Sequence, residues 1–332
     1  MDGQPHLIRA WGFAAAYKNT GLGGGAPDKA GAEVELFEDG MLEVRTSSAE
    51  LGQGLVTVLQ MIVAEEFGLP ASSVRVLVMD TDRTPDGGPT TASRQTFVTG
   101  NAALHAARSL RQAITATLAE KYDCPPEKIR FVEGLAQLDP ARGGPAIPLG
   151  EIVNAMQTEG RSACVSYEYW APETKPLGEG GDMHFAFSFA AQAAEIEVNS
   201  LTGEVRVLRV ISANDVGKAI NPLGLQGQVE GGVMMGLGNA LTENFIVEEG
   251  RVFTDRMARY RIPSIVHTPE ITSIVVEHPV AAGPHGAKGV GEIVSIPTTP
   301  AITNAIYNAI GVRVDRLPVD QAELVRQIAE NA

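Results

Sequence analysis

The sequence predicts an α+β fold with two mixed α/β lobes, at residues 1–145 and 146–332. Two observations favour this class. Strand-like and helix-like segments are mixed without the regular alternation of a parallel α/β sheet, and no internal repeat of fixed period is found. The length of 332 residues, 44% of them hydrophobic, allows one large core or two of medium size.

In the first lobe, AEVELFEDGMLEVRT (32–46) alternates apolar and charged residues around an Asp-Gly turn at Asp39, which predicts a β-hairpin. LVTVLQMIVAEEFGL (55–69) is apolar on nearly every side, which predicts a buried helix that ends near Gly68 and Pro70. The other elements expected here are a strand at 73–80, a long polar loop at 80–97, a helix at 98–122 and a strand pair at 129–138.

The segment ARGGPAIPLGE (141–151) is the most linker-like part of the chain and marks the predicted division between the lobes. Beyond it, residues 193–211 form a second expected hairpin around the turn NSLTG. A helix is expected at 297–311, with Thr299 as its cap and Gly311 as its stop. The remaining predictions are a small-residue helix at 221–243, a strand at 271–280 and an amphipathic helix at 320–330.

Composition limits the possible functions. The net charge of −14 argues against nucleic acid as a partner, because binding a phosphate backbone requires a basic face. The two cysteines, Cys124 and Cys164, lack metal-like spacing and predict neither a disulfide scaffold nor a cysteine-ligated metal site. This cysteine usage suits a reducing, cytoplasmic compartment. We find neither a signal peptide in MDGQPHLIRAWGF nor an apolar stretch that could span a bilayer.

Glycine is unusually clustered. The 36 glycines gather in seven short groups, from GLGGG near the amino terminus to GAKGVGE near residue 290. Any single group is best interpreted as a tight turn. Seven groups in one chain predict that the main chain closely surrounds a large ligand. GLGGG is followed by a loop and a strand rather than a helix, so it is no dinucleotide fingerprint. No GxxxxGK[ST], HExxH or GxSxG motif is present, and each of the six histidines is interpreted as structural.

Four polar, glycine-flanked motifs remain. LGQG places Gln53 at the start of a helix, where free N–H groups favour an anion. TTASRQT (90–96) is a dense set of hydrogen-bond donors, and GQVEGG places Gln228 before a small-residue helix. HGAKGVGE ends on Glu292, which is either a helix-start acid or a catalytic base. Taken singly, each motif also fits an ordinary capping residue or surface loop.

Taken as an ordered set, the motifs resemble the molybdenum-binding subunits of the xanthine dehydrogenase and aldehyde oxidase family, the molybdenum hydroxylases. The resemblance runs from about Ala32 to the carboxyl terminus. It depends on ELGQG, TTASRQT, AAEIEVNSLTGEVRV, NDVGKAINP, GQVEGG and GAKGVGE, which stand in the family's order and at its spacing.

The resemblance implies a molybdopterin cofactor, in its cytosine dinucleotide form, with the metal held by the pterin and by no protein side chain. Glu292 is then the catalytic base, and Gln228 acts with it near the metal-proximal oxygen. Arg94 is a candidate for contact with a cofactor phosphate, and Tyr17 for a substrate-facing aromatic. The implied cofactor-binding residues are Gly52, Gln53, Gly54, Thr90, Thr91, Ala92, Ser93, Arg94, Gln95, Thr96, Gln228 and Gly289.

The family's molybdenum unit is far longer than this chain, which also lacks iron–sulfur and flavin signatures. The resemblance therefore implies a split type, similar to the medium molybdenum subunit of nicotinate dehydrogenase. The expected partners are a second molybdenum-binding subunit, an FAD subunit and a [2Fe–2S] subunit. The implied reaction inserts a water-derived oxygen at an electron-poor carbon of a nicotinate- or purine-like N-heteroaromatic. Two alternatives stay open, an aldehyde oxidoreductase of the same family and a non-catalytic scaffold subunit.

Overall fold

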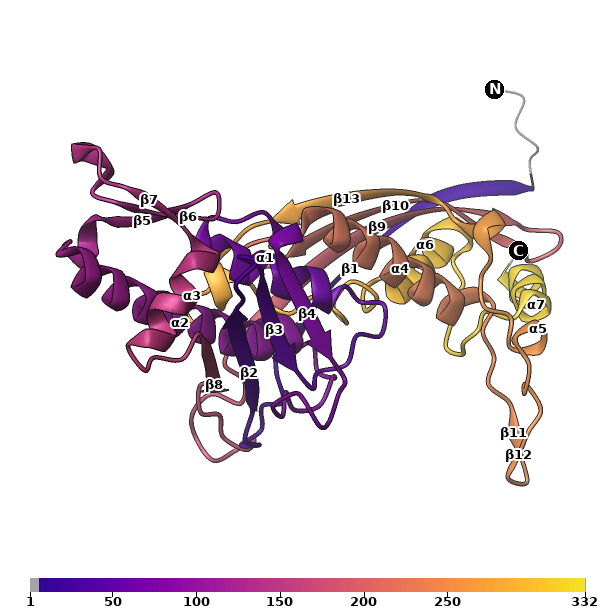
Figure 1. Ribbon diagram of the computed structural model, residues 1–332. Coiled ribbons are helices and arrows are strands. Elements are labelled where there is room, and N and C mark those ends of the chain that lie inside the picture. Colours follow the sequence, from indigo (N-terminus) through magenta and orange to yellow (C-terminus); the bar gives the residue numbers. More distant parts are fainter. Residues whose placement is uncertain (1–5, 332) are drawn as a thin grey trace.

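The computed structural model describes residues 6–331, which are organised around two four-stranded sheets (Figure 1). The first sheet has the order β4 (Val74–Val78), β3 (Leu42–Thr46), β2 (Lys29–Leu36) and β8 (Cys164–Trp170). The second has the order β1 (Leu7–Asn19), β9 (Phe187–Asn199), β10 (Val205–Asp215) and β13 (Glu270–Val276). A smaller sheet joins β5 (Ile129–Val132), β6 (Leu135–Leu138) and β7 (Ala146–Pro148).

The first sheet is covered by α1 (Leu55–Phe67) and α2 (Gly100–Tyr122), which pack on each other. Alternate residues of β2, such as Val34 and Leu36, are buried in the same core as Leu59 and Phe67 of α1. Period-two burial on β2 and burial of much of α1 are what the sequence predicts for the hairpin at 32–46 and the helix at 55–69. Both predictions are confirmed, and Gly68 ends α1 with a left-handed φ of 59°.

The second sheet is covered by α6 (Thr298–Ile310) and α4 (Pro222–Leu241), with α7 (Gln321–Asn331) contributing Leu324 to the same core. Gly12 of β1 allows α6 to approach closely, because a Cβ there would overlap the backbone of Ala301 and Ala305. The predicted hairpin at 193–211 and the helices at 221–243 and 320–330 are confirmed.

The remaining elements connect or extend the two sheets. They are α3 (Leu149–Thr158), the hairpin β11 (Val247–Glu248) and β12 (Arg251–Val252), the short helix α5 (Met257–Tyr260), a π-helical turn at Gln95–Thr99 that leads into α2, and 3₁₀ turns at Ala71–Ser73, Pro126–Lys128, Pro140–Arg142, Ile265–His267 and Pro284–Gly286. The β11–β12 hairpin projects away from the body of the molecule in Figure 1.

Three details of the sequence prediction are wrong. The boundary at residue 145 does not separate the sheets, because β8 pairs with β2 and β1 pairs with β9, each across that boundary. The supposed linker at 141–151 contains β7 and the start of α3. Thr299 is no cap: α6 begins at Thr298 without a side-chain cap, and the Thr299 hydroxyl donates to the carbonyl of Gly236 at 2.8 Å.

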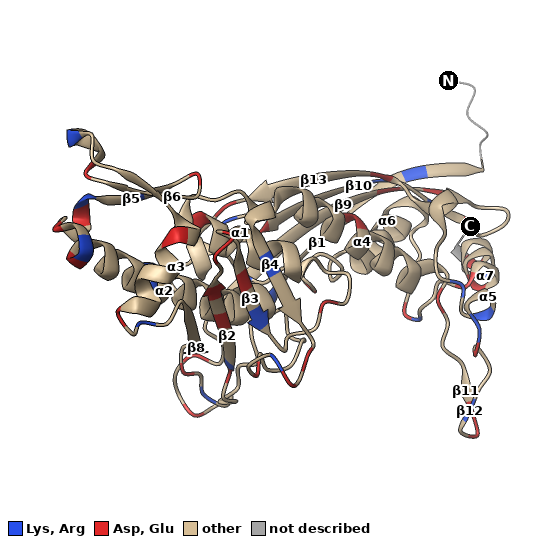
Figure 2. Cartoon of the chain, viewed as in Figure 1, with Lys and Arg blue, Asp and Glu red and all other residues tan. Residues whose placement is uncertain are grey.

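Charges are distributed without a single basic face in the view of Figure 2, where blue segments are scattered among red ones. Long tan stretches of β9, β10 and β13 carry few charges in the same view. Within residues 6–331, no helix combines the length and apolarity needed to cross a membrane. Residues 1–5 of the segment in which we predict no signal peptide lie outside the described residues.

Candidate cofactor and active site

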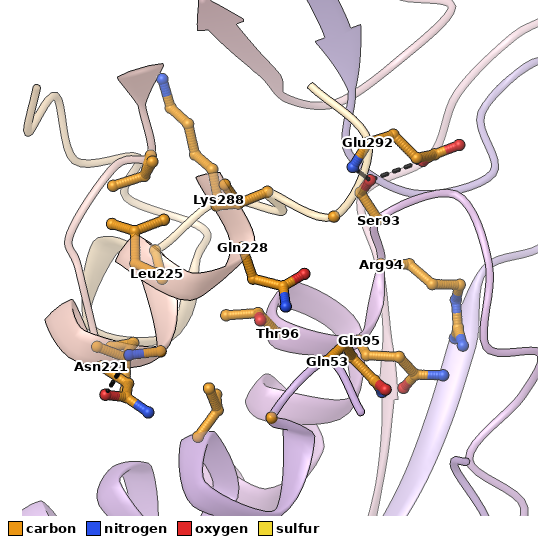
Figure 3. A pocket seen from close by; sticks show the side chains of 18 of the residues that line it. Gln53, Ser93, Arg94, Gln95, Thr96, Asn221, Leu225, Gln228, Lys288 and Glu292 are labelled. Atoms are coloured by element: carbon orange, nitrogen blue, oxygen red, sulfur yellow. Dashed lines mark hydrogen bonds between the residues drawn. The ribbon is translucent and has the colours of Figure 1, made fainter. Parts of the chain in front are cut away.

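A cavity of about 400 Å³ lies where loops from both sheets meet (Figure 3). All four motifs singled out in the sequence contribute to its wall, although they are spread over more than two hundred residues. Apolar side chains such as Leu51, Val58 and Leu225 complete the wall. The predicted site residues that line it are Gln53, Gly54, Thr90, Thr91, Ala92, Ser93, Arg94, Gln95, Thr96, Gln228 and Glu292.

The helix start at LGQG is already satisfied by the chain's own carboxylate. Glu50 accepts hydrogen bonds from the backbone N–H groups of Gly52 at 2.7 Å, Gly54 at 3.1 Å and Val56 at 3.0 Å. Burial by itself would raise the pKa of Glu50, but these backbone hydrogen bonds lower it below its usual value. The predicted anion site with free N–H groups is therefore wrong, since Glu50 occupies it. Sequence reasoning missed this acid, which stands four residues before Gly54.

Gln53 lines the cavity, but its amide closes its own loop. Its Oε1 accepts from the Leu51 N–H at 2.6 Å, and its Nε2 donates to the Ala49 carbonyl at 2.8 Å. Gly52, with a positive φ of 98°, belongs to the same turn but does not line the cavity. The LGQG segment thus contributes shape to the cavity wall, with its polar atoms engaged inside the loop.

Arg94 is turned away from the cavity in Figure 3, and its side chain is 0% exposed. Its Nε donates to Asp28 at 2.7 Å, and its Nη atoms donate to the carbonyls of Gly87, Pro89 and Lys29 at 3.0, 2.8 and 2.6 Å. The predicted contact with a cofactor phosphate is wrong for this guanidinium. Arg94 instead fastens the 90–96 loop to the start of β2.

The side chains of Thr90 and Gln95 form hydrogen bonds that stabilise the loop itself. The Thr90 hydroxyl accepts from the Ala49 N–H at 2.9 Å and from the Gln95 amide at 2.9 Å, and Gln95 Nε2 also donates to the Pro89 carbonyl at 3.1 Å. Over residues 6–331, by contrast, the side chains of Thr91, Thr96 and Gln228 have no hydrogen-bond partner. These three side chains are left for a ligand, as is Asn221 Nδ2, since among the same residues Asn221 engages only its Oδ1, which accepts from the Gly224 N–H at 3.0 Å.

Gln228 reaches the cavity from α4, and Figure 3 shows it and Thr96 pointing towards each other. Small residues place this helix close to the loop that carries Glu292. A Cβ at Gly232 would overlap Val294, and one at Gly236 would overlap Thr298. The small-residue pattern of GQVEGGVMMGLG therefore sets the distance between Gln228 and the GAKGVGE loop.

Glu292 lies at the rim, and its side chain is 48% exposed. The Ser93 hydroxyl donates to Glu292 Oε2 at 2.6 Å and accepts from the Glu292 N–H at 3.1 Å. Lys18 Nζ lies 3.1 Å from the same Oε2. Ser93 was predicted to bind the cofactor, but here its hydroxyl holds the proposed base.

The rest of the GAKGVGE loop is anchored by several contacts, which include hydrogen bonds of Gly289 and an ion pair of Lys288. Gly289 does not line the cavity; its N–H donates to Thr20 Oγ1 at 3.0 Å, and a Cβ on it would overlap the Ser93 carbonyl oxygen. Lys288 Nζ donates to Asp215 Oδ2 at 2.7 Å, with side-chain exposures of 8% and 14%. This buried ion pair links GAKGVGE to NDVG, a contact that the two motifs could have suggested but that sequence reasoning missed.

Tyr17 lies outside this cavity. Its side chain projects from β1 and is 69% exposed, with its ring 5.8 Å from that of Phe187 and 6.5 Å from that of Phe189. Tyr17 therefore belongs to an aromatic face of the second sheet, and the wall described above contains no part of it.

A profile of the molybdopterin cofactor-binding domain matches residues 2–269. The chain belongs to this family. A probable xanthine dehydrogenase subunit from Bacillus subtilis (strain 168) is 32% identical over 97% of the chain, which spans 42% of that relative's length. The family resemblance predicted from the ordered motifs is confirmed.

Solved structures of the family share the fold. Quinoline 2-oxidoreductase from Pseudomonas putida 86 has a TM-score of 0.84 and 25% identity over 98% of this chain and 42% of its own. Aldehyde oxidoreductase from Desulfovibrio desulfuricans ATCC 27774 has a TM-score of 0.79 and 29% identity over 98% of this chain and 33% of its own. These matches confirm the predicted mixed α/β, cofactor-binding fold.

The cavity of this chain fits part of a pterin cofactor. Thr91, Thr96 and Gln228 offer uncharged hydrogen-bonding groups, as a neutral polar heterocycle requires. Above Gly54, whose φ is 85°, no atom lies within 4 Å of the position of a Cβ, so backbone is open to a ligand there. These four residues are candidates for contact with the cofactor.

Proposed function

We propose that the chain is the molybdopterin-binding subunit of a heteromeric hydroxylase that inserts a water-derived oxygen at an electron-poor carbon of an N-heteroaromatic substrate. The observation that carries the proposal is the convergence of all four motifs on one cavity with Glu292 at its rim. A fold alone does not determine an activity, so the proposal depends on this site rather than on the architecture.

In the proposed reaction, substrate C–H and water give C–OH, two protons and two electrons. The molybdenum cofactor, when bound, supplies the redox chemistry by taking up the two electrons. Glu292 takes up a proton from the attacking oxygen, the role that a carboxylate at the rim of a cavity can fill. Gln228 and Thr96, which line the same cavity, orient the bound groups by hydrogen bonds.

The matched structures favour two candidate substrate classes. Quinoline 2-oxidoreductase acts, by its name, on an N-heteroaromatic ring, which agrees with the proposed nicotinate- or purine-like substrate. The second candidate is aldehyde oxidation, favoured by the higher identity to aldehyde oxidoreductase. Turnover of the assembled complex with nicotinate, hypoxanthine and benzaldehyde distinguishes the two, and activity confined to benzaldehyde would replace the first candidate by the second.

The cofactor form and the partners are part of the proposal. We expect the cytosine dinucleotide form, with FAD and [2Fe–2S] groups on partner subunits and a second molybdenum-binding subunit completing the site. The Bacillus relative is, by its name, one subunit of an enzyme, which supports a heteromeric assembly. The two free cysteines, Cys124 and Cys164, support the cytoplasm as its location. Acid release of CMP, together with flavin and iron–sulfur absorption of the purified complex, tests the cofactor and partner assignments.

Molybdenum analysis of the co-purified complex separates an enzyme from a scaffold subunit. We expect molybdenum in stoichiometric amount with this chain. A fully assembled complex without molybdenum would support the scaffold alternative and contradict the proposal.

Glu292→Gln tests the base. The amide keeps the size of the side chain but cannot take up the proton, so turnover is expected to fall by roughly 10²- to 10⁴-fold. Molybdenum and nucleotide content should stay at the wild-type level, which separates lost chemistry from lost cofactor. Near-normal turnover of this variant would refute the assignment, and Glu38→Gln, at an exposed acid that does not line the cavity, is the matched control.

A further inference from the structure

Lys18 is a charged residue near the proposed base that none of the motifs contains. It stands near the end of β1, where alternate residues Gly12, Ala14 and Ala16 face the helices and cores that cover the sheet. Lys18 continues this alternation and is directed to the same side. Its side chain is 20% exposed, and Nζ lies 3.1 Å from Glu292 Oε2.

The lysine is held in place independently of Glu292. Its Nζ donates to the Asn19 carbonyl at 3.0 Å and to Asn19 Oδ1 at 3.1 Å, while Asn19 Nδ2 donates to the Gly21 carbonyl at 2.7 Å. The contact with Glu292 Oε2 is an ion pair, added to these two hydrogen bonds. Lys18 therefore offers a fixed positive charge to the carboxylate.

The two carboxylate oxygens of Glu292 have different contacts. Oε2 accepts from Ser93 Oγ at 2.6 Å and is paired with Lys18, whereas Oε1 has no hydrogen-bond partner within residues 6–331. A carboxylate held at one oxygen by a hydrogen bond and an ion pair keeps the other oxygen in a defined direction. The GAKGVGE loop fixes the backbone of Glu292, and Ser93 and Lys18 fix its side chain.

We infer that Lys18 is a positioning residue for Glu292: together with Ser93 it holds Oε2 and leaves Oε1 as the oxygen that takes up the proton. This inference rests on the proposed function, in which Glu292 is the base. The alternative role for a lysine here is direct binding of an anionic group of the substrate, which would act on substrate affinity instead.

The first test replaces Lys18 in the assembled complex. Lys18→Met keeps much of the side-chain length without the charge, and Lys18→Arg keeps the charge. We expect kcat to fall at least tenfold in Lys18→Met with KM within about twofold, because misplaced reacting groups lower the rate rather than the affinity. Lys18→Arg should recover most of kcat. A rise in KM for carboxylate-bearing substrates with kcat unchanged would show substrate binding and overturn the inference.

The second test asks whether the effect passes through Glu292. In the Glu292→Gln background, Lys18→Met should change the residual rate less than twofold, because the group that Lys18 positions is no longer a base. An equal loss in both backgrounds would overturn the inference. Normal turnover of Glu292→Gln alone would instead contradict the proposed function, so the two failures are distinguishable. Lys18→Gln repeats both comparisons should Lys18→Met not assemble.

Discussion

The polar side chains around the cavity fall into two groups at the residue scale. Glu50, Gln53 and Gln95 direct their hydrogen bonds to neighbouring parts of the chain, and Arg94 joins its loop to the start of β2. Thr91, Thr96 and Gln228 line the wall without a hydrogen-bond partner among the described residues. The first group shapes the wall and the second is available to a ligand, so a motif residue is not automatically a contact residue. Glu292 differs from both groups, since one of its oxygens is held and the other has no partner within the described residues.

Glu50→Gln tests the self-capped helix start. Because the pKa of Glu50 is lowered in the folded chain, its contribution to stability is full above its unfolded value near 4.5 and is lost as pH falls through the lower folded value. At pH 7 we expect Glu50→Gln to lower the free energy of opening of the first turn of α1 by about 1 kcal/mol, the usual size of a capping effect. Hydrogen exchange of the complex, read by mass spectrometry, measures this loss.

The control for that experiment is pH itself. The difference between wild type and Glu50→Gln should shrink as the pH falls through the lowered pKa of Glu50, because the wild-type carboxylate becomes protonated. A difference that stays constant from pH 7 to pH 3 would mean that the ionised carboxylate is not what stabilises the helix start.

At the element scale, close backbone approach fixes where the loops stand. Gly289 packs against the Ser93 carbonyl, and Gly232 and Gly236 of α4 pack against Val294 and Thr298. Each is a position where even a methyl group has no room. The Lys288–Asp215 pair, 2.7 Å apart, ties the GAKGVGE loop to the end of β10. Glu292 is thus placed by three elements that are separated widely in the sequence.

Gly289→Ala should separate the GAKGVGE loop from the Ser93 loop. The added methyl group overlaps the Ser93 carbonyl, and overpacking of this kind typically costs about 1–3 kcal/mol. We expect a lower melting temperature of the complex and at least a tenfold loss of kcat, as the Ser93–Glu292 contacts are disturbed. Gly231→Ala, on an exposed position of α4 with no atom within 4 Å of its Cβ, is the matched control. Equal effects of the two variants would contradict the packing argument.

At the scale of the whole molecule, the second sheet has one covered face and one exposed face. Helices α4 and α6 lie on one face, while aromatic side chains of β1 and β9 stand on the other. The exposed fractions of Trp11, Phe13, Tyr17 and Phe189 are 41, 61, 69 and 51%. A contiguous apolar face of this kind is typical of an interaction surface. Within the proposed assembly, the second molybdenum-binding subunit is the partner that we expect to cover it.

Phe13→Ser combined with Tyr17→Ser should weaken that assembly. Aromatic residues at the centre of an interface commonly contribute at least about 2 kcal/mol each, so the double variant is expected to bind its partner several hundredfold more weakly. Quantitative co-purification or sedimentation of the complex measures the change. Leu201→Ser, at a 69% exposed residue in the β9–β10 turn, is the control for loss of exposed apolar area. Undiminished binding by the double variant would show that another surface joins the subunits.

Local chemistry determined the parts of the fold that the sequence predicted well. An Asp-Gly turn between alternating residues gives the β2–β3 hairpin, and an apolar run that ends at Gly68 gives α1. Strand β1 was missed because both of its faces are apolar, one with aromatic side chains and the other with alanine and glycine, which removes the period-two signal. Strand β8 and helix α3 were also missed. β8 is an edge strand with little burial, and α3 follows immediately after turn-forming residues, so neither has a clear periodic pattern.

The sequence by itself determined the family and the position of Glu292 as the acid that ends GAKGVGE, since both depend on residue types in a fixed order. Only the tertiary structure decided what each polar group of the site contacts. Arg94 is buried and bonds to the protein rather than to a phosphate. Glu50 accepts hydrogen bonds from N–H groups at the start of α1, and Lys18 of β1 pairs with Glu292. The physical reason is that hydrogen bonds and ion pairs of the site join residues up to 274 positions apart (Lys18 to Glu292), and no local pattern encodes such a pairing.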